Sequence, residues 1–313
     1  MRVGITGGTG FIGSPLVRRH LERGDQVRIL SRGTRDRSGL PDAVEVAIGD
    51  LTGSAEPLER FTDGLDVLYH CAGELRDESR MHRLHVDGTR ALVNAAAGRI
   101  GRWVQLSSVG VYGSHRIGVV REETATNPHG TYEVTKSISD ALVLAAAREG
   151  KLVATVLRPS IVFGAGMPNQ SIYQMVRMID RGLFFFIGKP GASANYIEVT
   201  NVVDALVLCA TRDEAKGRVY NLSDWCTLEA FVDTIADALH RRSPRIRVPE
   251  TPARLLAKTL GRVHRMPLTE SRVNALSSRH RYANDRVERE LGFAHSVSIA
   301  DGLKHLVETR GAA

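Results

Sequence analysis

Two side chains in the middle of this chain have the types and spacing of an acid–base pair. Tyr132 and Lys136 are four residues apart, which on a helix places them on the same face. An ammonium beside a phenol favours the phenolate, so we expect Lys136 to lower the pKa of Tyr132 from its usual ~10. Ser108 ends an earlier apolar run and could hydrogen-bond the same substrate oxygen. Together these residues predict proton transfer at a hydroxyl or carbonyl oxygen.

A glycine-rich turn near the N-terminus could hold the second reactant. Gly7, Gly10 and Gly13 are evenly spaced between an apolar run at 3–5 and a segment of helical spacing at 11–21. Such a turn lets a pyrophosphate approach main-chain N–H groups at the start of a helix, where the dipole favours negative charge. Its place between a strand and a helix predicts a dinucleotide site.

The end of the next predicted strand, at 26–30, indicates which dinucleotide binds. A carboxylate there holds the ribose 2′-hydroxyl of NAD, whereas an arginine accommodates the 2′-phosphate of NADP. The chain has Ser31 and Arg32 at this place, followed by Arg35 and Arg37, and no acid. We therefore predict NADP in preference to NAD, with solvated loop arginines as the alternative interpretation.

Alternating strands and helices must position these groups. Further strands are predicted at 44–48, 65–69, 102–107 and 152–157, and helices at 80–98 and 131–148. This alternation is typical of an α/β fold with a Rossmann-type, doubly wound parallel sheet. Asp50 follows the third strand, where it could hydrogen-bond an adenine amino group or cap the next helix near 52–54. Small residues such as Ala72 follow the fourth strand, where a cofactor could lie close.

Beyond Gly164 the pattern loosens into a smaller mixed lobe. Short strands at 196–199 and 218–222 are predicted to return to the main sheet. Helices are predicted near 172–180, 228–239, 252–262 and 285–291. We therefore expect a dinucleotide-binding domain of residues 1–163 plus about 195–222, and a substrate-binding lobe of about 164–194 plus 223–313.

Composition limits the classes of partner. The chain has 313 residues and a net charge of +7, and residues 240–290 hold 13 Lys and Arg against 5 Asp and Glu. This basic segment indicates either an anionic ligand or a solvated surface. Without a nucleic-acid-binding motif or interleaved aromatic residues, nucleic acid is not predicted. Three unpaired cysteines and no long apolar run predict no metal site, no disulfide framework and no membrane span, and a cytoplasmic location.

The motifs together resemble the extended short-chain dehydrogenase/reductases of the NAD-dependent epimerase/dehydratase group. The resemblance covers nearly the whole chain. The matching segments are residues 6–13, 49–51, 70–73, 86–89, 107–113, 132–136, 158–164, 290–293 and 300–303.

This resemblance implies a role for each candidate residue. Tyr132 would be the catalytic acid/base, Lys136 would hold the nicotinamide ribose and tune Tyr132, and Ser108 would polarise the substrate oxygen. Asp50 would bind adenine. The cofactor would also contact Gly7, Gly10, Phe11, Ile12, Gly13, Ser31, Arg32, Leu51, Ala72, Pro159 and Val162. The implied reaction is hydride transfer between a nicotinamide and a carbinol or carbonyl carbon, in a homodimer joined through the helices at 80–98 and 131–148.

Departures from the resemblance narrow the reaction. Val109 and Gly110 stand where the sugar dehydratases have Asp-Glu, which argues against dehydration. Many nucleotide-sugar enzymes have an asparagine where this chain has Ser160, and an arginine that grips the diphosphate where it has Ala194. Both changes weaken a nucleotide-sugar interpretation, and residues 196–205 look more like the 3β-hydroxysteroid dehydrogenase-like branch.

Three functions are therefore weighed. The leading one is an NADP-dependent oxidoreductase acting on a secondary alcohol or ketone of a bulky small molecule. A nucleotide-sugar 4-epimerase or 4-ketoreductase is the alternative, in which a basic residue such as Arg272 replaces the missing diphosphate grip. A non-catalytic NADP-binding protein comes third, because Ser108, Tyr132 and Lys136 are all present. His85 replaces a family asparagine, either for helix packing or to alter a proton-relay water.

Overall fold

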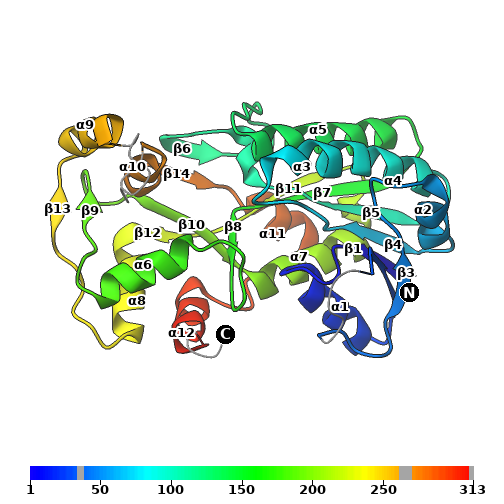
Figure 1. Cartoon of the computed structure of the whole chain (residues 1–313), viewed down its shortest axis with the longest axis horizontal. Helices are drawn as coiled ribbons and strands as arrows, with labels where there is room; N and C mark the ends of the chain where they lie inside the picture. The colour runs from blue at the N-terminus through cyan, green and yellow to red at the C-terminus, as the bar shows by residue number, and fades with distance from the viewer. Residues whose placement is uncertain (34–38, 261–269, 310–313) are drawn as a thin grey trace.

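The computed structural model of the chain describes residues 1–33, 39–260 and 270–309, with backbone only at 258–260 and 270–271. In this described part, a seven-stranded parallel sheet has helices on both faces (Figure 1). Its order is β11-β7-β5-β4-β1-β2-β3. The bounds are β1 (Arg2–Thr6), β2 (Gln26–Ser31), β3 (Glu45–Ile48), β4 (Val67–His70), β5 (Arg102–Leu106), β7 (Ala154–Pro159) and β11 (Val219–Leu222). The predicted doubly wound α/β class is confirmed.

The central strands β4 and β5 are buried on both faces, because successive residues point to opposite sides of the sheet and helices cover each side. In β4, Val67 and Tyr69 pack in the core cluster shared with α1 (Gly13–Glu22) and α7 (Val199–Thr211). Leu68, between them, packs in the cluster of the opposite face. The helices of that face are α2 (Ala55–Thr62), α4 (Gly88–Ala96) and α5 (Thr131–Arg148).

The helix predicted at 80–98 is interrupted. It is built from α3 (Glu78–His82), a π-helical turn η1 (Arg83–Asp87) and α4. A π turn places one extra residue in the helical circuit and is frequent at functional sites. Side chains before and after η1 therefore point in directions that a regular helix would not give them.

The lobe at the left of Figure 1 has its own sheet and core. β10 (Ser193–Glu198) lies between β8 (Ile161–Phe163), which is parallel to it, and β12 (Asp224–Thr227), which is antiparallel. The prediction that the strand near 196–199 returns to the main sheet is wrong, whereas β11 does join that sheet. The helices that share the lobe core are α6 (Ser171–Asp180), α8 (Leu228–Ala238) and α12 (Ile299–Thr309).

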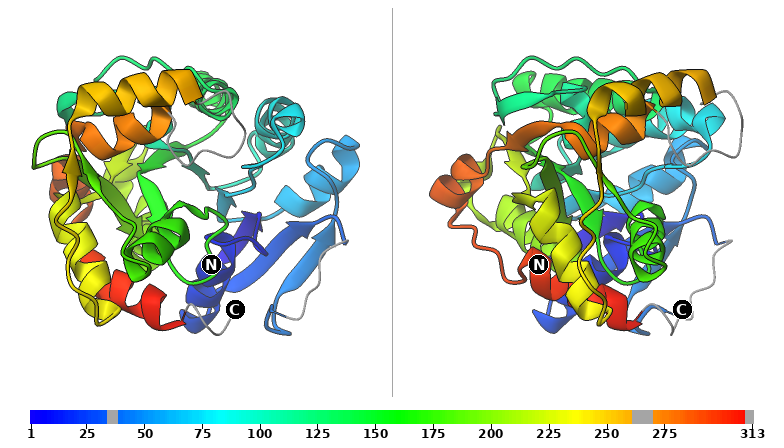
Figure 2. Two further views of the ribbon diagram at one scale, coloured as in Figure 1. Left: turned by 60° about the vertical axis from the view of Figure 1, so that its left-hand side comes forward. Right: turned by 90° about the vertical axis from the view of Figure 1, so that its left-hand side faces the viewer.

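The last third of the chain packs partly against itself and partly against segments from the middle of the chain. Figure 2 shows α12 beside α8, and α9 (Glu250–Leu260) beside α10 (Glu270–Ser277). Two short parallel pairs join β13 (Arg247–Val248) to β9 (Phe186–Ile187) and β14 (Arg279–Tyr282) to β6 (Ile117–Val120). None of the described helices combines the length and apolarity that a membrane span requires.

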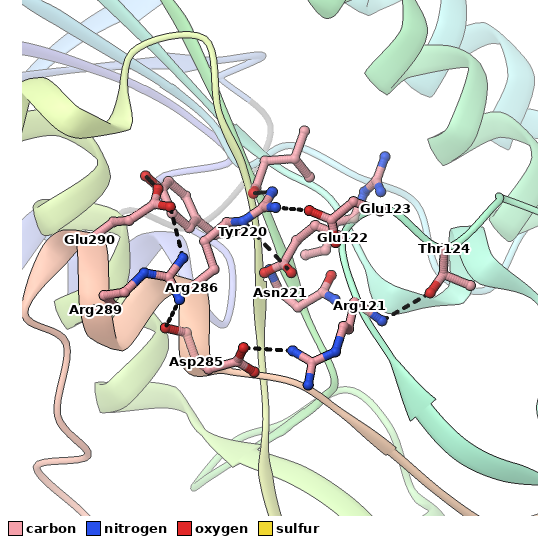
Figure 3. Close-up of polar contacts among 12 residues, drawn as sticks. Arg121, Glu122, Glu123, Thr124, Tyr220, Asn221, Asp285, Arg286, Arg289 and Glu290 are labelled. Atoms are coloured by element: carbon pink, nitrogen blue, oxygen red, sulfur yellow. Dashed lines mark hydrogen bonds and ion pairs between the residues drawn. The ribbon is translucent and has the colours of Figure 1, made fainter.

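Polar contacts fix α11 (Asp285–Leu291) to the edge of the main sheet (Figure 3). The hydroxyl of Tyr220 in β11 donates to Oε2 of Glu290 at 3.0 Å. Arg286 pairs with Glu123, and Arg121 pairs with Asp285 at 2.6 Å. The segment that follows β6 and the segment that follows β14 are therefore held against β11 together.

Candidate active site

The turn between β1 and α1 requires glycine at two positions. Gly7 has a φ of +70°, and a Cβ there would lie 2.8 Å from the backbone nitrogen of Ala72. A Cβ on Gly13 would lie 2.1 Å from the carbonyl oxygen of Gly7. The tight turn therefore brings the N-terminus of α1 against the end of β4. It exposes the backbone of Gly10 and Ile12 to a large cavity, in the position that favours a phosphate.

The carboxyl ends of β2 and β3 form one end of this cavity, which we call the β2–β3 end (Ser31, Arg32, Asp50 and Leu51). Oδ1 of Asp50 accepts hydrogen bonds from the backbone and hydroxyl of Thr52, at 2.8 and 2.9 Å. The backbone bond lowers the pKa of Asp50, burial opposes this shift, and the Thr52 hydroxyl and the charges of Arg32 and Arg83 lower it further. Asp50 is therefore an anion that organises its own turn, while the N-cap of α2 is Ser54.

A buried histidine fixes the end of β4. Nδ1 of His70 lies 2.7 Å from the Thr6 hydroxyl, and its Nε2 lies 3.0 Å from the Thr89 hydroxyl. Thr89 donates its own proton to the carbonyl of His85 at 2.6 Å, so it accepts from His70. Burial lowers the pKa of His70 to about 3. A neutral His70 with its proton on Nε2 therefore links β4 to β1 through Thr6 and to α4 through Thr89.

Ser108 follows the end of β5 and opens the short helix η2 (Val109–Tyr112). Its Oγ accepts from the backbone nitrogen of Gly110 at 3.1 Å, and its interaction with the Tyr132 hydroxyl lowers the pKa of that phenol. Tyr132 and Lys136 come from the first two turns of α5, so the helix face predicted from their spacing points at the strand end. The three predicted catalytic residues lie together on the wall of the same cavity.

The predicted pKa of Tyr132 is wrong. Burial raises it to about 12, the hydrogen bond with Ser108 opposes the rise, and the charge of Asp140 adds to it. Nζ of Lys136 donates to the carbonyl oxygen of Leu106 at 2.5 Å. In this structure Tyr132 is therefore a neutral phenol, because desolvation outweighs the effect that helical spacing alone suggested.

His85 in η1 links three segments around Tyr132. Its Nε2 accepts from the backbone nitrogen of Glu74 at 2.9 Å, and its Nδ1 lies 2.9 Å from the Thr135 hydroxyl. Thr135 donates to the carbonyl of Thr131, so Nδ1 carries the imidazole proton. The ring meets Tyr132 edge to face, with centroids 5.7 Å apart. Both nitrogens are thus occupied by protein groups, which favours the packing interpretation of His85 over a proton relay.

The glycine turn, the β2–β3 end and the Ser108, Tyr132 and Lys136 side chains line a cavity of about 1450 Å³. The structure brings to it every residue that the sequence suggested for catalysis or cofactor binding, and their roles stay predictions. These are Gly7, Gly10, Phe11, Ile12, Gly13, Ser31, Arg32, Asp50, Leu51, Ala72, Ser108, Tyr132, Lys136, Pro159 and Val162. Such a volume exceeds that of typical pockets for one small ligand and suits a dinucleotide with a second molecule beside it.

Other lining residues carried no recognisable sequence signal. Arg76, Arg80 and Arg83 line the cavity from the segment after β4. The opposite end, which we call the lobe end, is lined by Gly113, Ile161, Pro168, Asn169 and Tyr282. Tyr282 reaches the site because β14 pairs with β6. No local sequence pattern predicts that pairing.

Two basic features of the sequence are not found at the cavity among the described residues. Arg272 donates to Oε1 of Gln174 at 2.6 Å and is not among the described residues that line the cavity. Arg35 and Arg37 fall outside the described residues. Within the described ranges, no group of three or more His, Cys, Asp or Glu residues is placed to hold a metal ion.

Comparisons with known proteins agree with this geometry. The matching family model is described as the NAD dependent epimerase/dehydratase family and covers residues 3–223. "Sterol demethylase protein B" of Methylococcus capsulatus is 31% identical over 95% of this chain and 94% of that protein. A 4-hydroxy-2-methyl-3-oxo-4-farnesyl-3,4-dihydroquinoline-1-oxide ketoreductase of Stigmatella aurantiaca is 27% identical, covering 98% and 96%. A UDP-glucose 4-epimerase of Vibrio cholerae is 25% identical, covering 82% of each chain.

A solved relative has the same architecture. The dTDP-glucose 4,6-dehydratase DesIV from Streptomyces venezuelae, with NAD and TYD bound, superposes with a TM-score of 0.77 and 25% identity, covering 99% of this chain and 97% of that one. The family match, the relatives and the fold together place this chain in the NAD dependent epimerase/dehydratase family of extended short-chain dehydrogenase/reductases.

Proposed function

We propose that the protein is an NADP(H)-dependent oxidoreductase that acts on a secondary alcohol or ketone of a bulky, largely apolar molecule. The observation that carries this proposal is the convergence of Ser108, Tyr132 and Lys136 on the cavity that also contains the glycine turn. A protein that only senses NADP needs the turn but not this trio. The trio supports catalysis, because each member faces the place where a substrate oxygen would lie.

The chain's own groups suit the reduction of a ketone. When bound, the nicotinamide cofactor supplies the hydride or accepts it. Tyr132, whose pKa burial raises to about 12, holds its proton at neutral pH and would donate it to the developing alkoxide. Ser108 would hydrogen-bond the same oxygen, and Lys136 would hold the nicotinamide ribose and the phenolate left after proton transfer. In the oxidative direction the same proton returns from the alcohol to Tyr132.

The lobe end of the cavity supports an apolar substrate. The five residues that define it are uncharged and Ile161 is 43% exposed, although the guanidinium of Arg76 borders this end at the carbonyl of Pro168. Leu75, on the neighbouring wall, is 54% exposed. Arg272, the substitute grip considered for a sugar diphosphate, bonds Gln174 instead. Two similar proteins carry names that include a farnesylated quinoline oxide and a sterol, both of which are bulky apolar molecules.

A nucleotide-sugar 4-epimerase or 4-ketoreductase is the second candidate. One observation favours it: Arg76 and Arg80 line the cavity and could meet a diphosphate. Arg76 also donates to the carbonyl of Pro168 at 3.2 Å, a contact between the segment after β4 and the lobe. A diphosphate would have to compete with the carbonyl of Pro168 for the guanidinium of Arg76.

The proposal is tested first by ligand stabilisation and then by chemistry. Thermal unfolding is followed with saturating NADP⁺ and UDP, dTDP, GDP or an apolar secondary alcohol such as a 3β-hydroxysteroid. A ligand at ~100 times its Kd adds about 2.7 kcal/mol of stability. We expect stabilisation by the alcohol and none by the nucleotides. Stabilisation by one nucleoside diphosphate would instead establish the second candidate.

Tyr132→Phe then separates catalysis from binding. We expect it to lower NADPH-dependent reduction of the matching ketone by at least about 100-fold, which is the low end of acid–base contributions. The NADPH Kd should change little. Tyr173→Phe, a matched loss of a phenol hydroxyl away from the cavity lining, should retain activity. Full activity in Tyr132→Phe would refute the assignment of Tyr132.

A further inference from the structure

A buried ion pair lies behind the cavity, between α5 and β7. Nε of Arg158 donates to Oδ2 of Asp140 at 3.1 Å, and the two side chains are only 8% and 2% exposed. Burying such a pair costs desolvation energy, and apolar residues of similar volume often stabilise a fold as well or better. Stability alone therefore does not account for its position beside the catalytic helix.

Asp140 and Lys136 hold the end of β5 from two successive turns of α5. Lys136 donates to the carbonyl of Leu106 at 2.5 Å, and Oγ of Ser107 donates to Oδ2 of Asp140 at 2.8 Å. Leu106 and Ser107 are consecutive residues that lead directly into Ser108. The strand end and the helix are thus joined at two adjacent points.

Arg158 is fixed independently on its other side. Its Nη1 donates to the hydroxyl of Tyr112 at 3.0 Å, and its guanidinium carbon lies 5.1 Å from the centroid of that ring. Tyr112 in turn donates to Oδ1 of Asn221 in β11 at 2.8 Å. The guanidinium of Arg158 is therefore held in place by β11 and η2. From that position it fixes the orientation of the Asp140 carboxylate on α5.

We propose that Asp140 is a positioning residue that keeps the ammonium of Lys136 charged and in place against the end of β5. Residues four apart on a helix face each other, and a carboxylate there stabilises an ammonium strongly once water is excluded. The proposal rests on the proposed function in one respect: it takes Lys136 to be the residue that serves Tyr132.

The other groups around Lys136 cannot do this. Facing or near it, apart from Asp140, are His70 and Cys71 at the end of β4, His85 in η1, and Tyr132 on its own helix. Burial lowers the pKa of the two histidines to about 3 and 4 and raises the pKa of Cys71 to about 12. All are neutral at pH 7, as is Tyr132. Burial also lowers the pKa of Lys136, and the carboxylate of Asp140 opposes that shift. Burial raises the pKa of Asp140, and the charges of Arg158 and Lys136 and the hydrogen bonds from Ser107 and Arg158 oppose that rise.

The test follows the titration of Lys136 directly. The full-length protein is labelled with [13Cε]-lysine, and the Lys136 signal is identified as the one missing in Lys136→Met. In Asp140→Asn we expect the titration midpoint of Lys136 to fall by about one pH unit or more, as removal of a close charge in partly excluded solvent implies. An unchanged midpoint overturns the proposal.

Two further variants keep the result interpretable. Ser107→Ala removes a hydrogen bond to Asp140 but no charge, so the titration midpoint of Lys136 should remain that of the wild type. A fall in the midpoint equal to that in Asp140→Asn would also overturn the proposal. If Asp140→Asn does not fold, Asp140→Asn/Arg158→Gln replaces both charges by amides. The midpoint should still fall there, because the Asp140 carboxylate is the charge that raises the Lys136 pKa, and loss of the Arg158 cation offsets only part of that change. None of these readouts uses turnover, whereas failure of the proposed function appears in Tyr132→Phe.

Discussion

Arg32 lies on the wall of the β2–β3 end, where Asp50 and Arg83 also line the cavity. Asp50 is already engaged by Thr52, and the two guanidinium groups lie near enough to act on its charge. A guanidinium binds a phosphate dianion through two parallel hydrogen bonds but gains much less from a ribose hydroxyl. Two guanidinium groups and one carboxylate at the β2–β3 end give an excess of positive charge, which supports our proposal that NADP binds in preference to NAD.

Arg32→Ala should discriminate between the two cofactors. Loss of charge-assisted hydrogen bonds to a 2′-phosphate should raise the NADPH Kd by about 10-fold or more, and should change the NADH Kd much less. Fluorescence titration of both cofactors measures this ratio. Arg90→Ala, an exposed arginine of α4 that does not line the cavity, serves as the control. Equal losses for both cofactors in Arg32→Ala would remove the 2′-phosphate role.

Sequence spacing placed the proposed catalytic side chains together but did not give their protonation. Tyr132 and Lys136 could be placed on one helix face because the helical period is fixed. The pKa of Tyr132 depends on how completely the site excludes water and on the interaction with Ser108, which is contributed by a different element. Burial is a property of the assembled site, so the direction of the shift could not be predicted from the local pattern.

At the scale of elements, the π turn η1 is the feature that shapes this site. It separates α3 from α4 and brings Arg83 and Leu84 to the cavity while His85 remains buried beneath it. His85 then joins the segment after β4 to α5 through Glu74 and Thr135. A helix of regular period would not place all three side chains in these directions.

His85 should make stability depend on pH. Burial lowers its pKa to about 4, whereas an unfolded histidine has a pKa of about 6.5. The unfolded state therefore binds the proton more readily, and the free energy of unfolding falls as pH drops from about 6.5 towards 4. We expect wild type to lose about 2 kcal/mol more than His85→Asn between pH 7 and 5.

Urea unfolding at the two pH values measures this difference. His82→Asn, a change at an exposed histidine one turn earlier, should follow the wild type. Identical pH dependence in wild type and His85→Asn would show that His85 is not held neutral in the folded protein.

Elements with strong local patterns were predictable, and those that depend on distant pairing were not. The helix predicted at 131–148 and the short helix at 285–291 coincide with α5 and α11. The strand near 196–199 exists but belongs to the lobe sheet, because its neighbours β8 and β12 lie far from it in sequence. Strands such as β9 and β13 are two residues long and pair with each other across a gap of about sixty residues in the chain.

At the scale of the whole molecule, we predict a homodimer. α5 has one face in the core and two apolar side chains, Val134 and Ile138, that are 36% and 37% exposed. These residues are one turn apart and form a stripe that a second copy could cover. Light scattering after size exclusion should give twice the 34.2 kDa chain mass.

A variant pair tests the location of that interface. Val134→Glu/Ile138→Glu should shift the mass to that of the monomer, because charges in the centre of an apolar interface are strongly disfavoured. Leu183→Glu, at a more exposed leucine of the lobe, should leave the mass unchanged. A monomeric wild type at micromolar concentrations would refute the dimer.

The position of β11 has a consequence for how the chain is made. β7 ends at Pro159 and its outer neighbour β11 begins only at Val219, with β8, α6 and β10 between them. While a ribosome translates that interval, β7 presents an unpaired edge, which is a template for association with other chains. Nascent chains stalled between these two strands should therefore be the ones that aggregate or recruit chaperones. Emergence of β11 closes the edge and ends that exposure.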